Sequence, residues 1–129
     1  MRDAALFIAR FLIGFLMIGG AVNKAVGPDG ASALLTGGGL PQALVWPALA
    51  FNVVTGMALW LGIGVRSVAV IVAGYCALTS FFHLSIYLSQ DDAWQLTIFV
   101  KNWSVAGGCL ALSVAGSGAW ALRRDHGFA

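Results

Sequence analysis

The chain has 129 residues, of which 60% are hydrophobic and only 9% are charged. A soluble domain usually carries about 25% charged residues, so this chain lacks the polar side chains needed to cover a surface that faces water. Its net charge of +2 is scattered, without a run of Lys or Arg interleaved with aromatics, which excludes a nucleic-acid-binding surface. The composition predicts an integral membrane protein with residues 1–129 in a single domain.

Four apolar segments follow one another along the chain, at about 4–22, 43–63, 67–88 and 95–115. Each is close to the roughly 20 residues that a helix needs to cross the hydrocarbon core. Because a backbone in lipid must satisfy its hydrogen bonds internally, these runs are expected to be helices. Arg10 interrupts the first run and further spans follow, which indicates a retained span and not a cleaved signal peptide. The predicted fold class is all-α, an integral membrane four-helix bundle.

The three connections between these spans differ in length. Residues 23–42 form the long one, in which the segment ASALL (31–35) between glycines is predicted to form one or two helical turns at the interface. GIGVRS (62–67) predicts a tight hairpin, and SQDDAW (89–94) predicts a short acidic loop. Small residues also repeat every fourth position, a pattern that lets helices approach closely within a chain or against a partner. They are Ala48, Asn52 and Gly56 on the second span, Ala69, Ala73 and Ala77 on the third, and Gly107, Ala111 and Ala115 on the fourth.

The basic residues indicate the orientation. Four spans place both termini on one side, together with four arginines, whereas the opposite loops hold Lys24 and three aspartates. The four are Arg2, Arg66, Arg123 and Arg124. By the positive-inside rule both termini are expected in the cytoplasm, and the protein in the cell's inner (cytoplasmic) membrane.

Arg10 and Arg66 are interpreted as structural or anchoring residues. Arg10 lies in the inner third of the first span, where its guanidinium is expected to reach the cytoplasmic headgroups. Pairing with Asp3 or Asp125 is the alternative for Arg10.

Polar side chains from several spans are expected at a similar depth. At about 1.5 Å per helical residue, Lys101 lies about 9 Å and His83 about 8 Å from the outer ends of their spans. Asn52 lies somewhat deeper, and Lys24 closes the first span on the same side. Ionisable groups inside a membrane are costly and are candidates for function. The sequence therefore predicts an outer polar pocket with five candidate ligand-binding residues: Lys101, Asn102, His83, Asn52 and Lys24.

Structural interpretations of the same residues stay open. Lys101 could extend outward along its aliphatic stem to Asp91 or Asp92. His83 could be a polar side chain satisfied by a neighbour, and Asn52 could form an interhelical hydrogen bond.

The sequence contains no recognisable catalytic or metal-binding constellation. Cys76 and Cys109 form no CxxC or zinc motif and are interpreted as small buried hydrophobes, with a redox pair as the alternative. The spans hold no carboxylate, no second histidine for haem and no nucleophile–base pair. We expect no catalytic residue, no metal and no intrinsic cofactor, and no enzyme activity of the chain on its own.

The motifs in chain order resemble those of DoxX-like membrane proteins. IARFLIGFLMIGGAVNKAVGPDG resembles the family's opening, GMALWLGIGVRSVAV its glycine-rich second span, and FFH the end of its third. FVKNWSVAGGCLALSVAGSGAWALRRD resembles its Lys-Asn and Gly-Gly pattern. The resemblance implies a four-helix membrane protein linked to quinol oxidases, thiosulfate:quinone oxidoreduction and oxidative stress. It points to Arg10, Lys24, Arg66, His83, Lys101 and Asn102. Many relatives have a Glu where this chain has Asn52, so a proton role of that Glu is not expected here.

Three functions remain open at this point. The first is a redox-linked accessory subunit of a respiratory or quinone-dependent oxidoreductase complex, with a quinone as ligand in the outer pocket. The second is a small channel or transporter for an anion or weak acid. The third is a purely structural assembly subunit. The expected partners are the lipid bilayer and either a larger membrane complex or further copies of this chain, and no nucleic acid.

Overall fold

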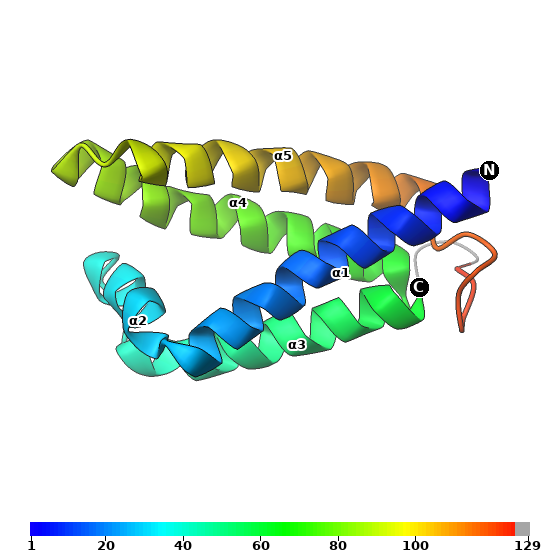
Figure 1. Ribbon diagram of the computed structural model, residues 1–129, viewed down its shortest axis with the longest axis horizontal. Coiled ribbons are helices and arrows are strands. Elements are labelled where there is room, and N and C mark those ends of the chain that lie inside the picture. The colour runs from blue at the N-terminus through cyan, green and yellow to red at the C-terminus, as the bar shows by residue number, and fades with distance from the viewer. Residues whose placement is uncertain (126–129) are drawn as a thin grey trace.

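The computed structural model describes residues 1–125, and the regular structure in this part of the chain is entirely helical. Figure 1 shows the arrangement of these helices. The helices are α1 (Arg2–Val26), α2 (Pro28–Gly37), the short 3-10 helix η1 (Gln42–Leu44), α3 (Val45–Leu61), α4 (Val65–Gln90) and α5 (Ala93–Ala115).

Four segments within the described residues are long and apolar enough to cross a membrane, which confirms the predicted number of spans. They are Arg2–Val26, Gln42–Leu61, Val65–Gln90 and Ala93–Ala115. The first helix continues four residues beyond its predicted end because its apolar run is followed by no helix breaker before Pro28. The residue before a proline is disfavoured in the α region, and the chain leaves the helix at Gly27.

The long helices form two antiparallel pairs. α1 packs against α3 and α4 packs against α5 along their lengths, whereas contacts between the two pairs are sparse. Figure 1 shows the pairs close together where α1 begins and α5 ends, and separated at the other end, which α2 covers in part. We call the first end the termini end and the second the α2 end.

The α1–α3 pair depends on two glycines that bring the backbones together. A Cβ on Gly14 would lie 2.5 Å from Trp60 Cδ1 and 3.0 Å from the Gly56 carbonyl oxygen. A Cβ on Gly56 would lie 2.8 Å from Ile18 and 3.1 Å from the Gly14 carbonyl oxygen. Small residues at such a crossing allow the close van der Waals contact that holds helices together in lipid.

The termini end contains most of the buried apolar core. The core joins Met17 of α1 to Leu59 of α3 and to buried residues of α4 and α5. Between α3 and α4, Gly62 and Gly64 have φ angles of 74° and 58°, which make the predicted hairpin possible. Residues 116–125 then fold back under the bundle, where the Leu122 amide donates a hydrogen bond to the Leu61 carbonyl.

The structure corrects two details of the predicted elements. The segment predicted as one or two turns at ASALL is a helix of 10 residues, because Pro28 begins it at a favourable first-turn position. On α5 the predicted small-residue stripe faces outward: Gly107 and Ala111 are exposed, and nothing lies within 4 Å of a Cβ on Gly107. The buried face of α5 is formed by Asn102, Ala106, Cys109, Leu112 and Ser113 instead.

Candidate functional site in the cleft at the α2 end

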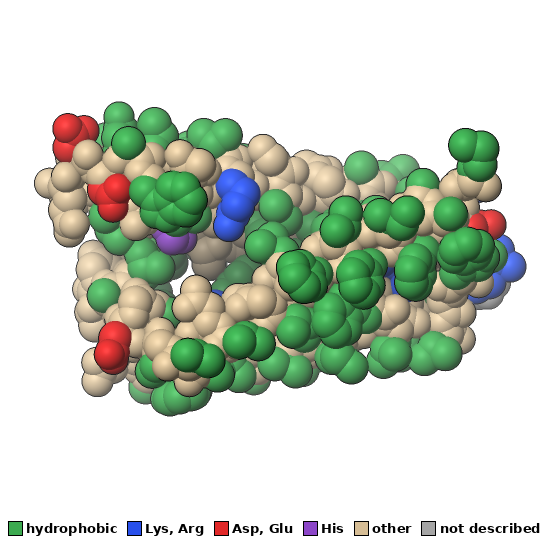
Figure 2. Space-filling view, viewed as in Figure 1, with side chains coloured by type: hydrophobic (Ala, Val, Ile, Leu, Met, Phe, Trp, Pro, Cys, Tyr) green, Lys and Arg blue, Asp and Glu red, His purple; other side chains and the backbone are tan. Residues whose placement is uncertain are grey.

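Separation of the two helix pairs leaves a cleft at the α2 end. Figure 2 shows it as a hollow between the α4–α5 pair and the side formed by α1, α2 and α3. A cavity of about 500 Å³ lies elsewhere, between α2 and the start of α3. It contains none of the five candidate residues. The surroundings of the five candidate residues are therefore those of the cleft.

Asn52 and Tyr75 join the two helix pairs at the floor of the cleft. Asn52 Nδ2 donates to the Met17 carbonyl at 3.0 Å, which is the interhelical hydrogen bond considered from the sequence. The Tyr75 hydroxyl donates to Asn52 Oδ1 at 3.1 Å, and the Tyr75 ring lies 4.6 Å from the ring of Phe51. Asn52 thus connects α1, α3 and α4, and its side chain is almost fully buried.

Lys24 turns back along α1 toward this floor. Its ammonium lies 3.4 Å from the Gly20 carbonyl oxygen, one helical turn earlier. A Cβ on Gly20 would lie 2.5 Å from Asn52 Nδ2 and 3.7 Å from Lys24 Nζ, so the amide and the ammonium meet where Gly20 has no side chain. Lys24 and Asn52 therefore lie near each other on either side of Gly20.

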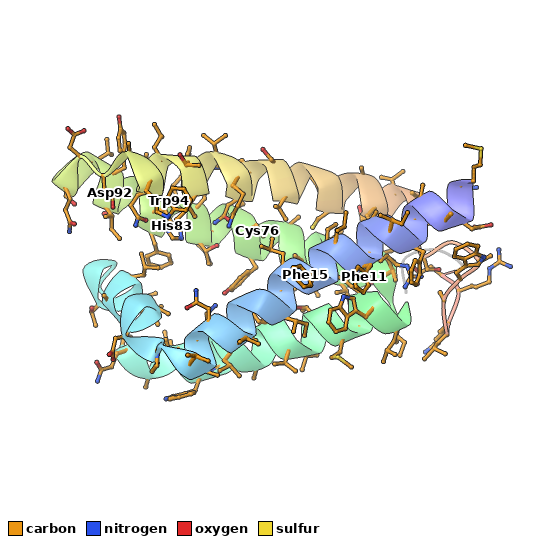
Figure 3. All side chains as sticks on the ribbon, in the orientation of Figure 1. Phe11, Phe15, Cys76, His83, Asp92 and Trp94 are labelled. Carbon is orange, nitrogen blue, oxygen red and sulfur yellow. The ribbon has the colours of Figure 1, made fainter. Side chains whose placement is uncertain are left out.

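On the opposite wall, polar side chains of α4 and α5 contact each other. His83 Nδ1 lies 2.7 Å from Gln95 Oε1, and Asn102 Nδ2 lies 3.5 Å from the Thr79 hydroxyl. Figure 3 shows His83 and Trp94 toward the α2 end and Cys76 nearer the middle of the bundle. His83 therefore has a polar partner on the adjacent helix, as its structural interpretation expects, while it remains only half-buried.

Lys101 has an exposed side chain on α5 and makes no hydrogen bond or ion pair with another described residue. Its charge is close enough to act on Cys76 of α4. Lys101 is the one basic residue of α5. The structure thus shows no pairing with Asp91 or Asp92; the Asp92 carboxylate instead accepts from the Trp94 amide at 3.1 Å.

The two arginines of the prediction lie at the termini end, away from the cleft. Arg10 is fully buried and does not extend to the headgroups: it donates to the Leu59 carbonyl at 2.8 Å and to the Trp120 carbonyl. The reason is that residues 116–125 fold over the beginning of α1, where the Trp120 carbonyl accepts from the guanidinium. Arg66 donates to the Ser113 and Val114 carbonyls at 2.9 and 2.6 Å, at the end of α5.

Two contributors to the cleft, Tyr75 and Gln95, were missed by sequence reasoning. Tyr75 lies one helical turn before Thr79, which itself precedes His83 by one turn, so the three recur at every fourth residue of α4. That spacing was available in the sequence. Gln95 is recognisable only once the two-residue loop between α4 and α5 aligns it with His83.

The polar side chains around the cleft come from both helix pairs, and none of their hydrogen bonds within the described residues is to a carboxylate. Lys24 lies on α1, the Asn52–Tyr75 hydrogen bond crosses from α3 to α4, and Lys101 and Asn102 lie on α5. Within the described residues, no group of three or more metal-ligating side chains forms a metal site. Such a site suits an oxygen-rich ligand that accepts hydrogen bonds from cations.

Comparisons with known proteins agree with this architecture. The family model described as DoxX matches residues 5–84, which end within α4. The chain is 27% identical to the Inner membrane protein YqjF of Escherichia coli (strain K12) over 124 residues. That similarity covers 96% of this chain and 93% of the relative, so it includes α5. No solved structure matches the chain.

Proposed function

The chain belongs to the DoxX family, and from this premise we propose that it is a redox-linked accessory subunit of a respiratory or quinone-dependent oxidoreductase complex. It is a multi-pass protein of the inner membrane. In this proposal the cleft at the α2 end faces the outer leaflet and holds a quinone headgroup, and the exposed apolar surface contacts lipid and the larger complex.

One observation carries the proposal: Lys24 of α1 and Lys101 of α5, on the two helix pairs that border the cleft, have no carboxylate partner in the described part of the chain. Lys24 has a single long hydrogen bond to its own helix, and Lys101 has none. An ammonium within the membrane is costly unless it meets acceptors. The two carbonyl oxygens on opposite sides of a quinone ring are suitable acceptors for cations on two facing walls.

The apolar surroundings fit the rest of such a ligand. The Phe51 and Tyr75 rings at the floor can pack against a flat ring, and the apolar helix surfaces would receive an isoprenoid tail. The protein residues would hold and orient the headgroup and exclude water from it. The electrons would be supplied and taken up by redox centres of the complex.

The experiment measures quinone bound to the protein extracted gently from its own membrane. Lipid extracts of the purified wild type, Lys101→Met and Lys24→Met would be analysed for quinone by mass spectrometry, and a short-chain quinone would be titrated against each. We expect substoichiometric to stoichiometric quinone in the wild type and about tenfold weaker binding in each lysine variant, the effect of losing one charge-assisted hydrogen bond. Arg123→Gln, at the opposite end, is the matched control and should bind as the wild type does.

Two results would contradict the proposal. One is wild-type protein that neither carries quinone nor binds the short-chain analogue. The other is binding that is equal in the wild type and both lysine variants, which would place the quinone elsewhere. Native electrophoresis of the same extracts tests the accessory role, because a subunit is expected to migrate with a larger redox complex.

The pair of cations also favours a second candidate, a permeability element for an anion or weak acid. Two positive charges without a carboxylate attract anions along the cleft. Proteoliposomes that contain a pH-sensitive dye would report acetate influx. This candidate predicts that acetate influx falls severalfold in Lys101→Met. Influx equal to that of the wild type in Lys101→Met, measured with quinone-free protein, would contradict it.

A further inference from the structure

A second polar site lies at the termini end, at the opposite end of the molecule from the proposed quinone cleft. It is a cavity of about 140 Å³, formed where α1 and α4 begin and where α5 ends. A water molecule occupies about 30 Å³ in the liquid, so the cavity has room for a small polyatomic ion or headgroup but not for a larger metabolite. Its lining is almost entirely polar or glycine: Arg2, Asp3, Arg66, Ala115, Gly116, Ser117, Gly118, Arg124 and Asp125.

The charges of this lining favour an anion. It contains three arginines and two aspartates, so its net charge is +1. Both aspartates are engaged in holding the backbone: Asp3 accepts from the Ala119 amide at 2.9 Å, and Asp125 accepts from the Arg66 amide at 3.1 Å. Their hydrogen bonds to amides reduce the negative charge that they offer to the cavity.

The three arginines differ in how many of their hydrogen-bond donors are already used. Arg66 is fixed by the Ser113 and Val114 carbonyls and forms a rigid cationic wall. Arg2 reaches the Ala115 carbonyl only at 3.4 Å, and Arg124 makes no hydrogen bond with another described residue. A guanidinium presents five donors in a planar fork that matches the oxygens of phosphate. Arg2 and Arg124 therefore retain donors for a bound ion.

We propose that this cavity, the termini-end pocket, binds a phosphate group through Arg2 and Arg124. The helix ends around it lie where a span leaves the hydrocarbon core, which is the depth of lipid phosphates. Basic pockets between helix ends are suited to anionic headgroups. The phosphodiester of an anionic lipid and free inorganic phosphate share this chemistry, and the experiment separates them.

The test is a set of thermal unfolding titrations of the purified full-length protein in neutral detergent. The ligands are short-chain phosphatidylglycerol, inorganic phosphate and, as a salt control, chloride at matched ionic strength. A ligand that binds only the folded state raises the melting temperature with concentration, which gives an apparent Kd. We expect phosphatidylglycerol or phosphate to raise the melting temperature above the chloride control.

Charge-neutralising variants locate the binding. Arg124→Gln and the double variant Arg2→Gln/Arg124→Gln are expected to weaken the apparent affinity by at least about tenfold, and Arg124→Lys by less, because lysine keeps the charge without the fork. Arg123→Gln is the matched control: it removes an adjacent arginine that does not line the pocket, and should change the affinity by less than about twofold. Each melting curve without ligand shows whether the variant is folded.

The outcomes are distinct. A shift with phosphatidylglycerol but not with phosphate assigns the site to a lipid, and equal affinity for the two assigns it to the phosphate group itself. No shift above chloride with either ligand overturns the proposal. So does equal weakening in Arg123→Gln and Arg124→Gln, which would mean diffuse attraction to a basic surface. None of these results depends on quinone binding in the cleft.

Discussion

Asn52 is the side chain through which three helices meet. Its amide group donates to α1 and accepts from Tyr75 of α4 while its backbone belongs to α3. An amide is suited to this position because it is donor and acceptor without a charge. The carboxylate that many relatives are expected to have here could accept from Tyr75 but, when ionised, could not donate to the Met17 carbonyl. An amide at this position can therefore make both hydrogen bonds, whereas an ionised carboxylate could make only the one from Tyr75.

Removal of this polar connection should have a modest effect on stability. Interhelical hydrogen bonds in membranes average about 0.6 kcal/mol, so Tyr75→Phe should cost about that amount and Asn52→Leu about twice as much. In a double-mutant cycle the two losses should overlap by about 0.6 kcal/mol, because both variants remove the same bond. The measurement is reversible unfolding in mixed micelles. Tyr87→Phe on the same helix is the control and should be neutral; strictly additive losses would show that the Asn52–Tyr75 bond contributes nothing.

Arg10 has a different function, since it holds the end of the chain under the bundle. Its guanidinium joins α1 to the Leu59 and Trp120 carbonyls and lies 5.5 Å from the centre of the Phe7 ring. Hydrogen bonds to charged groups contribute about 1.5 to 3 kcal/mol each, more than neutral ones. Loss of this side chain would leave carbonyls without a donor at a buried position.

We therefore expect Arg10→Met to lower the free energy of unfolding by about 3 kcal/mol. Arg10→Lys should lose about half as much, because a single ammonium cannot reproduce the fork between two carbonyls. The released segment 116–125 would also become accessible, so limited trypsin digestion should cut after Arg123 or Arg124 severalfold faster than in the wild type. Unchanged stability and unchanged cleavage in Arg10→Met would refute this function of Arg10.

At the scale of elements, the α1–α3 pair depends on steric room more than on polar contacts. Gly14 and Gly56 face each other across the crossing, and each would place a Cβ about 3 Å from the other's carbonyl oxygen. Gly14→Ala and Gly56→Ala should each destabilise the pair by about 1 to 3 kcal/mol, the usual cost of overpacking. Gly107→Ala, where a Cβ meets nothing within 4 Å, should be neutral or slightly stabilising, because alanine is the better helix former. Equal effects at all three positions would mean that helix propensity, and not contact between the helices, determines the change in stability.

The number of spans could be predicted from the sequence, but the end of α1 and the rotation of α5 could not. Four spans were predictable because the spanning length and the cost of exposed backbone polar groups act on each segment separately. The end of α1 was misplaced because the apolar run weakens before the helix stops at Gly27. The rotation of α5 was not predictable: its small-residue stripe and its buried face both lack charges, and in lipid an apolar surface is stable on either side.

At the scale of the whole molecule, the depth of the candidate residues could be predicted from the sequence, but their contacts could not. Depth follows from position along a helix, so Lys24, Asn52, His83 and Lys101 were expected in a common zone. Which of them meet depends on how the two helix pairs are placed, and that depends on the core at the termini end. In the structure Lys24 lies near Asn52, His83 contacts Gln95, and Lys101 is exposed on α5.

The orientation of the molecule determines which compartment each site faces. The termini end holds Arg2, Arg66, Arg123 and Arg124, whereas the loops at the α2 end hold no basic residue besides Lys24, close to the end of α1. By the positive-inside rule we expect the termini in the cytoplasm, the termini-end pocket in the inner leaflet and the cleft toward the outer leaflet.

Cysteine labelling tests this arrangement directly. Asp29→Cys places a thiol on α2, and Arg123→Cys places one at the termini end; the wild type is the blank, because Cys76 and Cys109 are buried. A membrane-impermeant maleimide should label position 29 in spheroplasts, and position 123 only after the membrane is opened. The reverse pattern would turn the cleft toward the cytoplasm. The lysines there would then face cytoplasmic anions, which would favour the permeability function over the subunit.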